Sequence, residues 1–123
     1  MRVPLALSLS LFLAMGALLG GCGPDCQSSC EKIFGDGPEE CAIPIIGNSA
    51  QEMTRDCAAH CEQALQRNGD VGTYKPNDHT SGNDEVSLEN EKQAALWMDC
   101  IELTNCDFLN SGYCAPVKNF PAN

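Results

Sequence analysis

The residues best suited to chemistry in this 123-residue chain are its nine cysteines. Two pairs have the Cys-x3-Cys spacing, Cys26 with Cys30 and Cys57 with Cys61, and His60 lies inside the second pair. Thiolates are the ligands that Cu(I) and Zn(II) select, and a thiol of lowered pKa can carry out redox exchange. Oxidation to disulfides would remove the same residues from both kinds of chemistry. The first question is therefore which cysteines are structural.

The first cysteine, Cys22, follows a segment typical of a secretory signal peptide. Residues 1–21 have a basic start at Arg2, an apolar run from Val3 to Leu19 and two glycines at the end. A charged start, an apolar stretch and a small-residue cleavage zone are the parts of such a peptide, which is removed from the mature protein. An uncleaved transmembrane helix is disfavoured, because this run is at the short limit for crossing a bilayer about 30 Å thick.

The residues before Cys22 also indicate a role for it. The run Leu19-Gly20-Gly21-Cys22 resembles the lipobox of bacterial lipoproteins, an apolar residue followed by two small ones and the cysteine. In that family the thiol receives a diacylglyceryl group, a signal peptidase cuts just before the cysteine, and the new amino terminus is acylated. The resemblance covers 1–22 and implies that Cys22 is a lipidation site. Two or more acyl chains give stable anchoring to a membrane.

The same resemblance carries an expectation about location. It implies a lipid-anchored protein of the bacterial cell envelope, with 22–24 as the lipidated N-terminus and tether. In Gram-negative lipoproteins an Asp directly after the cysteine tends to retain the protein at the inner membrane, and here that residue is Gly23. The outer membrane is therefore expected if the source is Gram-negative.

The cysteines after Cys22 are even in number, which in an exported chain predicts a disulfide framework. The segment they staple has only six aromatic residues, so its core is thin, and each bridge can add about 2 to 4 kcal/mol of stability. The alternative is copper or zinc binding through clustered cysteines, although the copper-storage bundles that such motifs resemble contain many more of them. The eight are Cys26, Cys30, Cys41, Cys57, Cys61, Cys100, Cys106 and Cys114.

The two Cys-x3-Cys motifs predict a particular pairing. On a helix this spacing places both sulfurs on one face, one turn apart. Two such helices lying antiparallel would therefore pair Cys26 with Cys61, and Cys30 with Cys57. The spacing resembles the twin Cys-x3-Cys hairpins of small mitochondrial chaperones and of some plant antimicrobial peptides. That resemblance implies an architecture and carries no function.

Four cysteines remain after this pairing. Cys100 is expected to point inward from a helix, with Cys41 in the preceding loop as its partner by elimination. Cys106 and Cys114 would then close a small loop through 110–112, which is a turn-prone run. Eight cysteines allow 105 connectivities, and the sequence alone does not select among them.

Three helices are predicted to carry the cysteines. The clearest begins at a capping box, from Ser49 to Glu52, and ends where Asn68-Gly69 supplies a stop signal. A shorter helix begins after 24–25 and ends at 35–38.

A third helix is expected from about Ser87 to Leu103, with Trp97 packed over the hairpin as the largest piece of the core. The polar stretch 69–86 between the second and third helices has no apolar period and predicts a long loop.

Charge and motif content narrow the function. From Cys22 onward the chain carries all 17 acidic residues but only six basic ones, a formal charge of 6 − 17 = −11. Binding to phosphates needs a basic surface, so we expect no nucleic-acid partner. The only histidines are His60 and His79, and no hydrolase motif surrounds them. We therefore expect no enzyme activity, no cofactor and no metal.

These patterns predict a mainly α fold over 25–123, a small disulfide-stapled bundle of about three helices with long loops. The expected function is a non-catalytic, acidic structural or binding domain of the bacterial envelope, held to a membrane by the lipid on Cys22 and able to contact an envelope protein. A copper- or zinc-binding periplasmic lipoprotein is the alternative.

Overall fold

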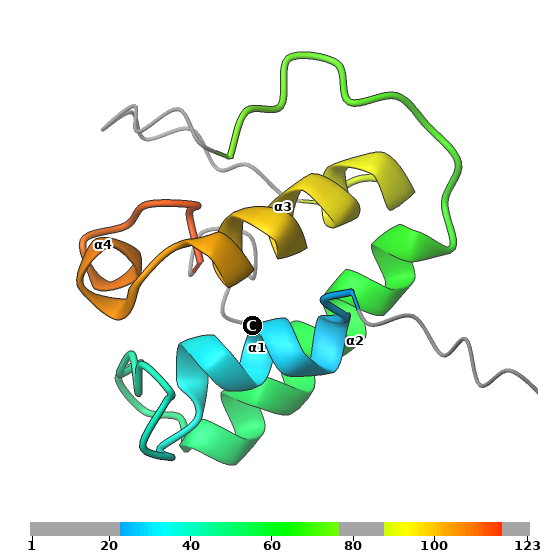
Figure 1. Cartoon of the computed structure of the whole chain (residues 1–123). Coiled ribbons are helices and arrows are strands. Elements are labelled where there is room, and N and C mark those ends of the chain that lie inside the picture. Colours follow the sequence, from blue (N-terminus) through cyan, green and yellow to red (C-terminus); the bar gives the residue numbers. More distant parts are fainter. Residues whose placement is uncertain (1–22, 77–87, 117–123) are drawn as a thin grey trace, which may run out of the picture.

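The computed structural model describes residues 23–76 and 88–116 and contains four helices there, with no strand. The predicted signal peptide, Cys22 and His79 lie outside these residues. In chain order the helices are α1 (Cys26–Phe34), α2 (Ala50–Leu65), α3 (Glu91–Leu103) and α4 (Cys106–Asn110). α1 and α2 lie antiparallel, α3 packs against both, and the short α4 lies beyond the end of α3 (Figure 1). The prediction of a small, disulfide-stapled helical bundle is confirmed.

Capping boxes start the two helices of the hairpin. The backbone N–H of Ser28 donates to the Asp25 carboxylate over 2.7 Å, and the Asp25 N–H donates back to the Ser28 hydroxyl. At α2 the Glu52 N–H donates to the Ser49 hydroxyl over 3.2 Å, while the Ser49 N–H donates to the Glu52 carboxylate over 2.9 Å. The second box is the one predicted from the sequence, and both satisfy amide donors that a helix start leaves unpaired.

α3 begins later than predicted. Its N-cap is Asn90 and its first residue is Glu91, so the expected start at Ser87 is wrong. The Asn90 side chain accepts from two backbone N–H groups of the first turn and donates to the Asp70 carbonyl over 2.9 Å. Leu88 lies before the helix and is itself buried. The cap is thus selected by a contact with a distant part of the chain.

The core lies between the three longer helices. Its largest fully buried side chains are those of Trp97, Phe34, Ile33 and Ile101. Trp97 therefore packs inside the bundle, as its position on the apolar stripe predicted. Among the described residues no helix is both long enough and apolar enough to cross a membrane.

Two disulfides join α1 to α2 in the predicted pairing. Cys26 bonds Cys61 with 5.6 Å between their Cα atoms, and Cys30 bonds Cys57 with 5.8 Å. The mirrored order of the two motifs brings the bonds one above the other along the antiparallel pair. Each crosslink lies one helical turn from the next, which fixes the register of the hairpin.

The other two disulfides differ from the prediction. Cys41 bonds Cys106, and Cys100 bonds Cys114, so the expected pairs Cys41 with Cys100 and Cys106 with Cys114 are wrong. The segment expected to form a simple loop contains α4, followed by a tight turn through Gly112 at φ +99°. That turn directs Cys114 back to Cys100, where both are buried, and leaves Cys106 facing the loop that carries Cys41.

A lysine on α1 caps the C-terminal end of α3. The Lys32 ammonium donates to the carbonyls of Ile101, Glu102 and Thr104 over 2.7 to 2.8 Å. These carbonyls lie at the C-terminus of α3, where the helix leaves acceptors without partners and its dipole is negative. Burial lowers the pKa of Lys32 from its ordinary value, and the charge of Glu102 opposes that change.

Candidate functional site

The clustered cysteines are not available as metal ligands in this structure. All eight that lie in the described residues are in disulfides. His60 lies half-buried on α2, next to Cys61. Within residues 23–76 and 88–116, no three His, Cys, Asp or Glu side chains are grouped so that they could hold a metal ion. The cysteine-ligated copper or zinc site considered above would need these disulfides to be reduced.

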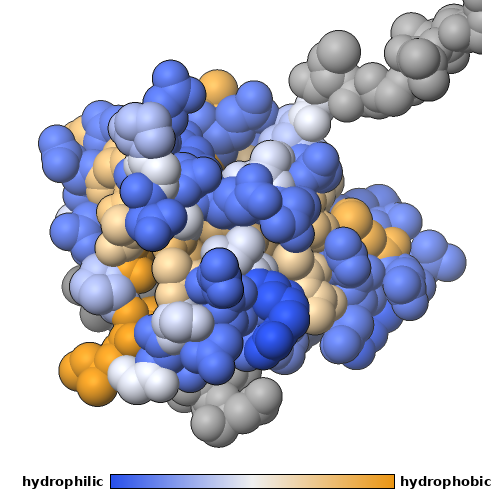
Figure 2. Space-filling model, turned by 90° about the horizontal axis from the view of Figure 1, so that it is seen from below, coloured by the Kyte–Doolittle hydropathy of each residue, from blue (hydrophilic) through white to orange (hydrophobic). Residues whose placement is uncertain are grey.

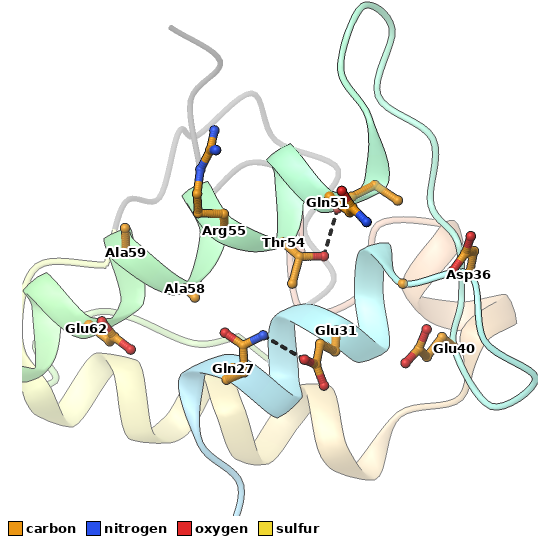
Figure 3. Close-up of a pocket in the computed structure, with 12 residues that line it drawn as sticks. Gln27, Glu31, Asp36, Glu40, Gln51, Thr54, Arg55, Ala58, Ala59 and Glu62 are labelled. Atoms are coloured by element: carbon orange, nitrogen blue, oxygen red, sulfur yellow. Dashed lines mark hydrogen bonds between the residues drawn. The ribbon is translucent and has the colours of Figure 1, made fainter.

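A groove of about 630 Å³ lies on the outer side of the α1–α2 hairpin. Its lining comes from both helices and from the first residues of the loop that joins them (Figure 3). Small side chains leave the space open, because α2 presents Ala58 and Ala59 and the end of α1 is followed by Gly35. The antiparallel packing that the two disulfides impose thus creates the groove.

Four of the five charged side chains that line the groove are acidic. Gln27 donates to the Glu31 carboxylate over 2.6 Å, and the Gly37 N–H donates to the Glu40 carboxylate over 2.7 Å, so two of the acids are oriented by neighbours. The basic lining residue, Arg55, is turned away from α1 (Figure 3) and forms an ion pair with Asp56 at 3.4 Å. The four lining carboxylates belong to Glu31, Asp36, Glu40 and Glu62.

The lining is suited to electrostatic contact. No cysteine, histidine or lysine is among the groove residues, and the Thr54 hydroxyl donates to the Ala50 carbonyl over 2.8 Å. Carboxylates on an open rim attract cationic groups, and contacts of this kind are weakened by salt. Sequence reasoning did not find the groove, because its residues are spread from Gln27 to Glu62 and meet only when the hairpin forms.

A second surface feature is an end of the molecule with exposed apolar side chains, called here the apolar end. The stretch 41–51 has no charged residue, and its Ile46 is fully exposed. Leu103 is 86% exposed and Phe108 is 59% exposed, on either side of Cys106. The Cys41–Cys106 bond joins the two segments. Seen from below, hydrophobic side chains gather at the end of the molecule where the α1–α2 loop lies (Figure 2).

This apolar end was also missed from the sequence. An uncharged run of eleven residues in a chain of net charge −10 is the signal that points to it. The disulfide between Cys41 and Cys106 connects this run to the segment that carries Leu103 and Phe108. Contiguous exposed apolar surface is typical of contact sites.

Comparison with known proteins adds no relative from which a role could be transferred. No protein-family model, no curated protein and no solved structure gives a significant match to this chain. The class of protein is therefore defined by its structure alone. This is a small helical domain stapled by four disulfides, with an acidic groove on one side of its hairpin and an apolar end.

Proposed function

We propose that the protein is a bacterial lipoprotein whose domain is held at a membrane of the cell envelope by a lipid on Cys22. One observation carries the proposal. The four disulfides use eight of the nine cysteines, and the ninth is the cysteine of the lipobox-like run at 19–22. The cysteine without a place in these four disulfides is therefore the one that the lipobox resemblance identifies as the lipidation site.

Two further observations support the location. Disulfides form and persist in oxidising compartments such as the bacterial periplasm and cell surface, and this domain has four in about one hundred residues. The capping box at Asp25 starts the fold three residues after Cys22. A lipid on Cys22 would hold α1 close to the headgroups, and Gly23 after it favours the outer membrane in a Gram-negative cell.

The proposed role of the domain is structural or binding, without catalysis. The acidic groove and the apolar end offer two surfaces for an envelope protein. A net charge of −11 from Cys22 onward opposes binding to nucleic acid and adsorption to anionic headgroups, so the lipid is the expected means of membrane attachment.

The experiment that tests this proposal is the intact mass of protein extracted from bacterial membranes. We expect a chain that starts at Cys22 and carries the mass of its acyl groups. Cys22→Ser should lack the acyl mass and keep its four disulfides. Gly23→Ala is the matched control, because an added Cβ there meets nothing within 4 Å, and it should carry the acyl mass of the wild-type protein. An unprocessed N-terminus in the wild-type protein, or acyl mass that persists in Cys22→Ser, would contradict the anchor.

A further inference from the structure

The four disulfides differ in how well the fold shields them from solvent. Cys41 and Cys106 are both partly exposed, and they are bonded to each other. The other three bonds are enclosed by the core, since none of their six cysteines is more than 4% exposed. These six are Cys26, Cys30, Cys57, Cys61, Cys100 and Cys114.

Exposure determines which bond can react with an external thiol. In thiol–disulfide exchange a thiolate attacks one sulfur of the disulfide directly, so the rate depends on access to that sulfur. We propose that Cys41–Cys106 is a site of reversible exchange with a dithiol, while the other three bonds of the folded domain stay closed. The inference depends on burial alone and holds whether or not Cys22 carries a lipid.

The dithiol supplies the electrons and protons that this reaction needs. One thiolate of the reductant bonds to Cys41 or Cys106, the bond between the two cysteines breaks, and the released sulfur takes up a proton. The second thiol of the reductant then attacks the mixed disulfide. Two electrons and two protons pass to the protein, which gains two thiols, and the reductant becomes a disulfide.

Opening this bond would leave the domain folded. The loop is still held to α1, because the backbone N–H groups of Cys41 and Ile43 donate to the carbonyls of Lys32 and Ile33 over 2.7 and 2.9 Å. Ile43 also remains packed in the core. The chain after α4 keeps its own attachment through the buried bond between Cys100 and Cys114.

What changes is the apolar end. Cys41–Cys106 is the covalent link between the uncharged stretch with Ile46 and the segment with Leu103 and Phe108. Reduction removes the covalent link between the two parts, so the exchange acts on that surface, while the three buried disulfides continue to hold the core.

The test uses the oxidised, folded chain and dithiothreitol as the dithiol. Samples are quenched with N-ethylmaleimide over time, and the alkylated cysteines are identified by peptide mass mapping. We expect a species with two new labels, on Cys41 and Cys106, to form at least tenfold faster than any label on the six buried cysteines. Its helical circular dichroism should match that of the oxidised protein. A Cys22 thiol without lipid is labelled before dithiothreitol is added and is not counted. First labelling at another pair, or loss of all four bonds together, would overturn the proposal.

Two controls separate burial from intrinsic reactivity. In a denaturing concentration of urea the preference for Cys41–Cys106 should disappear, because unfolding exposes all four bonds, and a preference that persists there would contradict the argument. The double variant Cys41→Ser/Cys106→Ser should keep its helical spectrum, and its six buried cysteines should take up no label at the dithiothreitol concentration that opens the wild-type bond. The time course of the wild-type chain decides the question even if that variant folds poorly.

Discussion

Replacing Lys32 by Met tests how α1 and α3 are held together beyond the core. Met has a similar apolar stem and keeps the packing, but it removes the ammonium that donates to three carbonyls at the end of α3. The carbonyls of Ile101 and Thr104 are partly buried, whereas the contact with the Glu102 carbonyl is exposed to water. Water can therefore replace the lysine fully only at the exposed carbonyl.

The expected loss of unfolding free energy follows from this difference between partly buried and exposed carbonyls. Hydrogen bonds from a charged donor contribute about 1.5 to 3 kcal/mol each, so three would sum to well above 4 kcal/mol. Two costs reduce that sum. Burial disfavours the ammonium, as its lowered pKa indicates, and ordering the long side chain costs up to about 2 kcal/mol. Leaving two partly buried carbonyls underpaired costs about 1 kcal/mol each, so we expect Lys32→Met to lower the unfolding free energy by about 2 kcal/mol.

The assay is guanidinium unfolding with the disulfides intact, followed by the fluorescence of the buried Trp97. Lys92→Met is the matched control, since Lys92 makes an equally short contact of 2.8 Å, but to the exposed carboxylate of Asp70. That variant should unfold at nearly the wild-type midpoint, because exposed ion pairs contribute little and are screened by salt. Equal midpoint shifts for the two variants, or none for Lys32→Met, would refute the capping argument.

Three other substitutions test the fold. Gly69→Ala should destabilise the domain by about 1 kcal/mol in urea unfolding, because its Cβ would lie 2.6 Å from the Asn90 amide nitrogen and displace the cap of α3. Trp97→Ala should cost about 3 to 5 kcal/mol in urea unfolding followed by helical circular dichroism, as expected for a fully buried aromatic side chain. Glu52→Gln tests pH dependence: the Ser49 N–H lowers the pKa of the Glu52 carboxyl, so its stabilisation is present above the ordinary value of 4.5 and is lost as pH falls through the lower folded value. The variant should show a flatter fall of the thermal midpoint in that acidic range.

The features predicted correctly are those with a local signal. The Ser49 capping box, the facing Cys-x3-Cys motifs and the buried position of Trp97 each follow from spacings within one or two helical turns. Such spacings determine which side chains share a helical face before any tertiary contact forms. An apolar face with cysteines on it can be buried in few ways, and an antiparallel hairpin is the simplest.

The start of α3 depends instead on a tertiary contact. Ser87 and Asn90 are both suitable N-cap residues by type. The sequence favours Ser87 because Leu88 then joins the apolar stripe and acidic residues fall in the first turn. The Asn90 side chain, however, also donates to the Asp70 carbonyl, and the Glu91 N–H donates to the Arg67 carbonyl over 2.9 Å. Both partners lie at least 20 residues away, so no local pattern contains them.

The cysteine pairing near the C-terminus shows that the preference for closing the shorter loop is weak. Joining Cys106 to Cys114 would close a separation of eight residues, whereas the observed bond from Cys100 closes 14. Closure entropy changes by only about 0.6 kcal/mol for each doubling of loop length, so the shorter loop is favoured by less than that. Burying a single CH2 group already contributes about 0.8 kcal/mol, and the observed pairing buries both Cys100 and Cys114. Packing therefore outweighs loop length, and it leaves Cys41–Cys106 as the bond that solvent can reach.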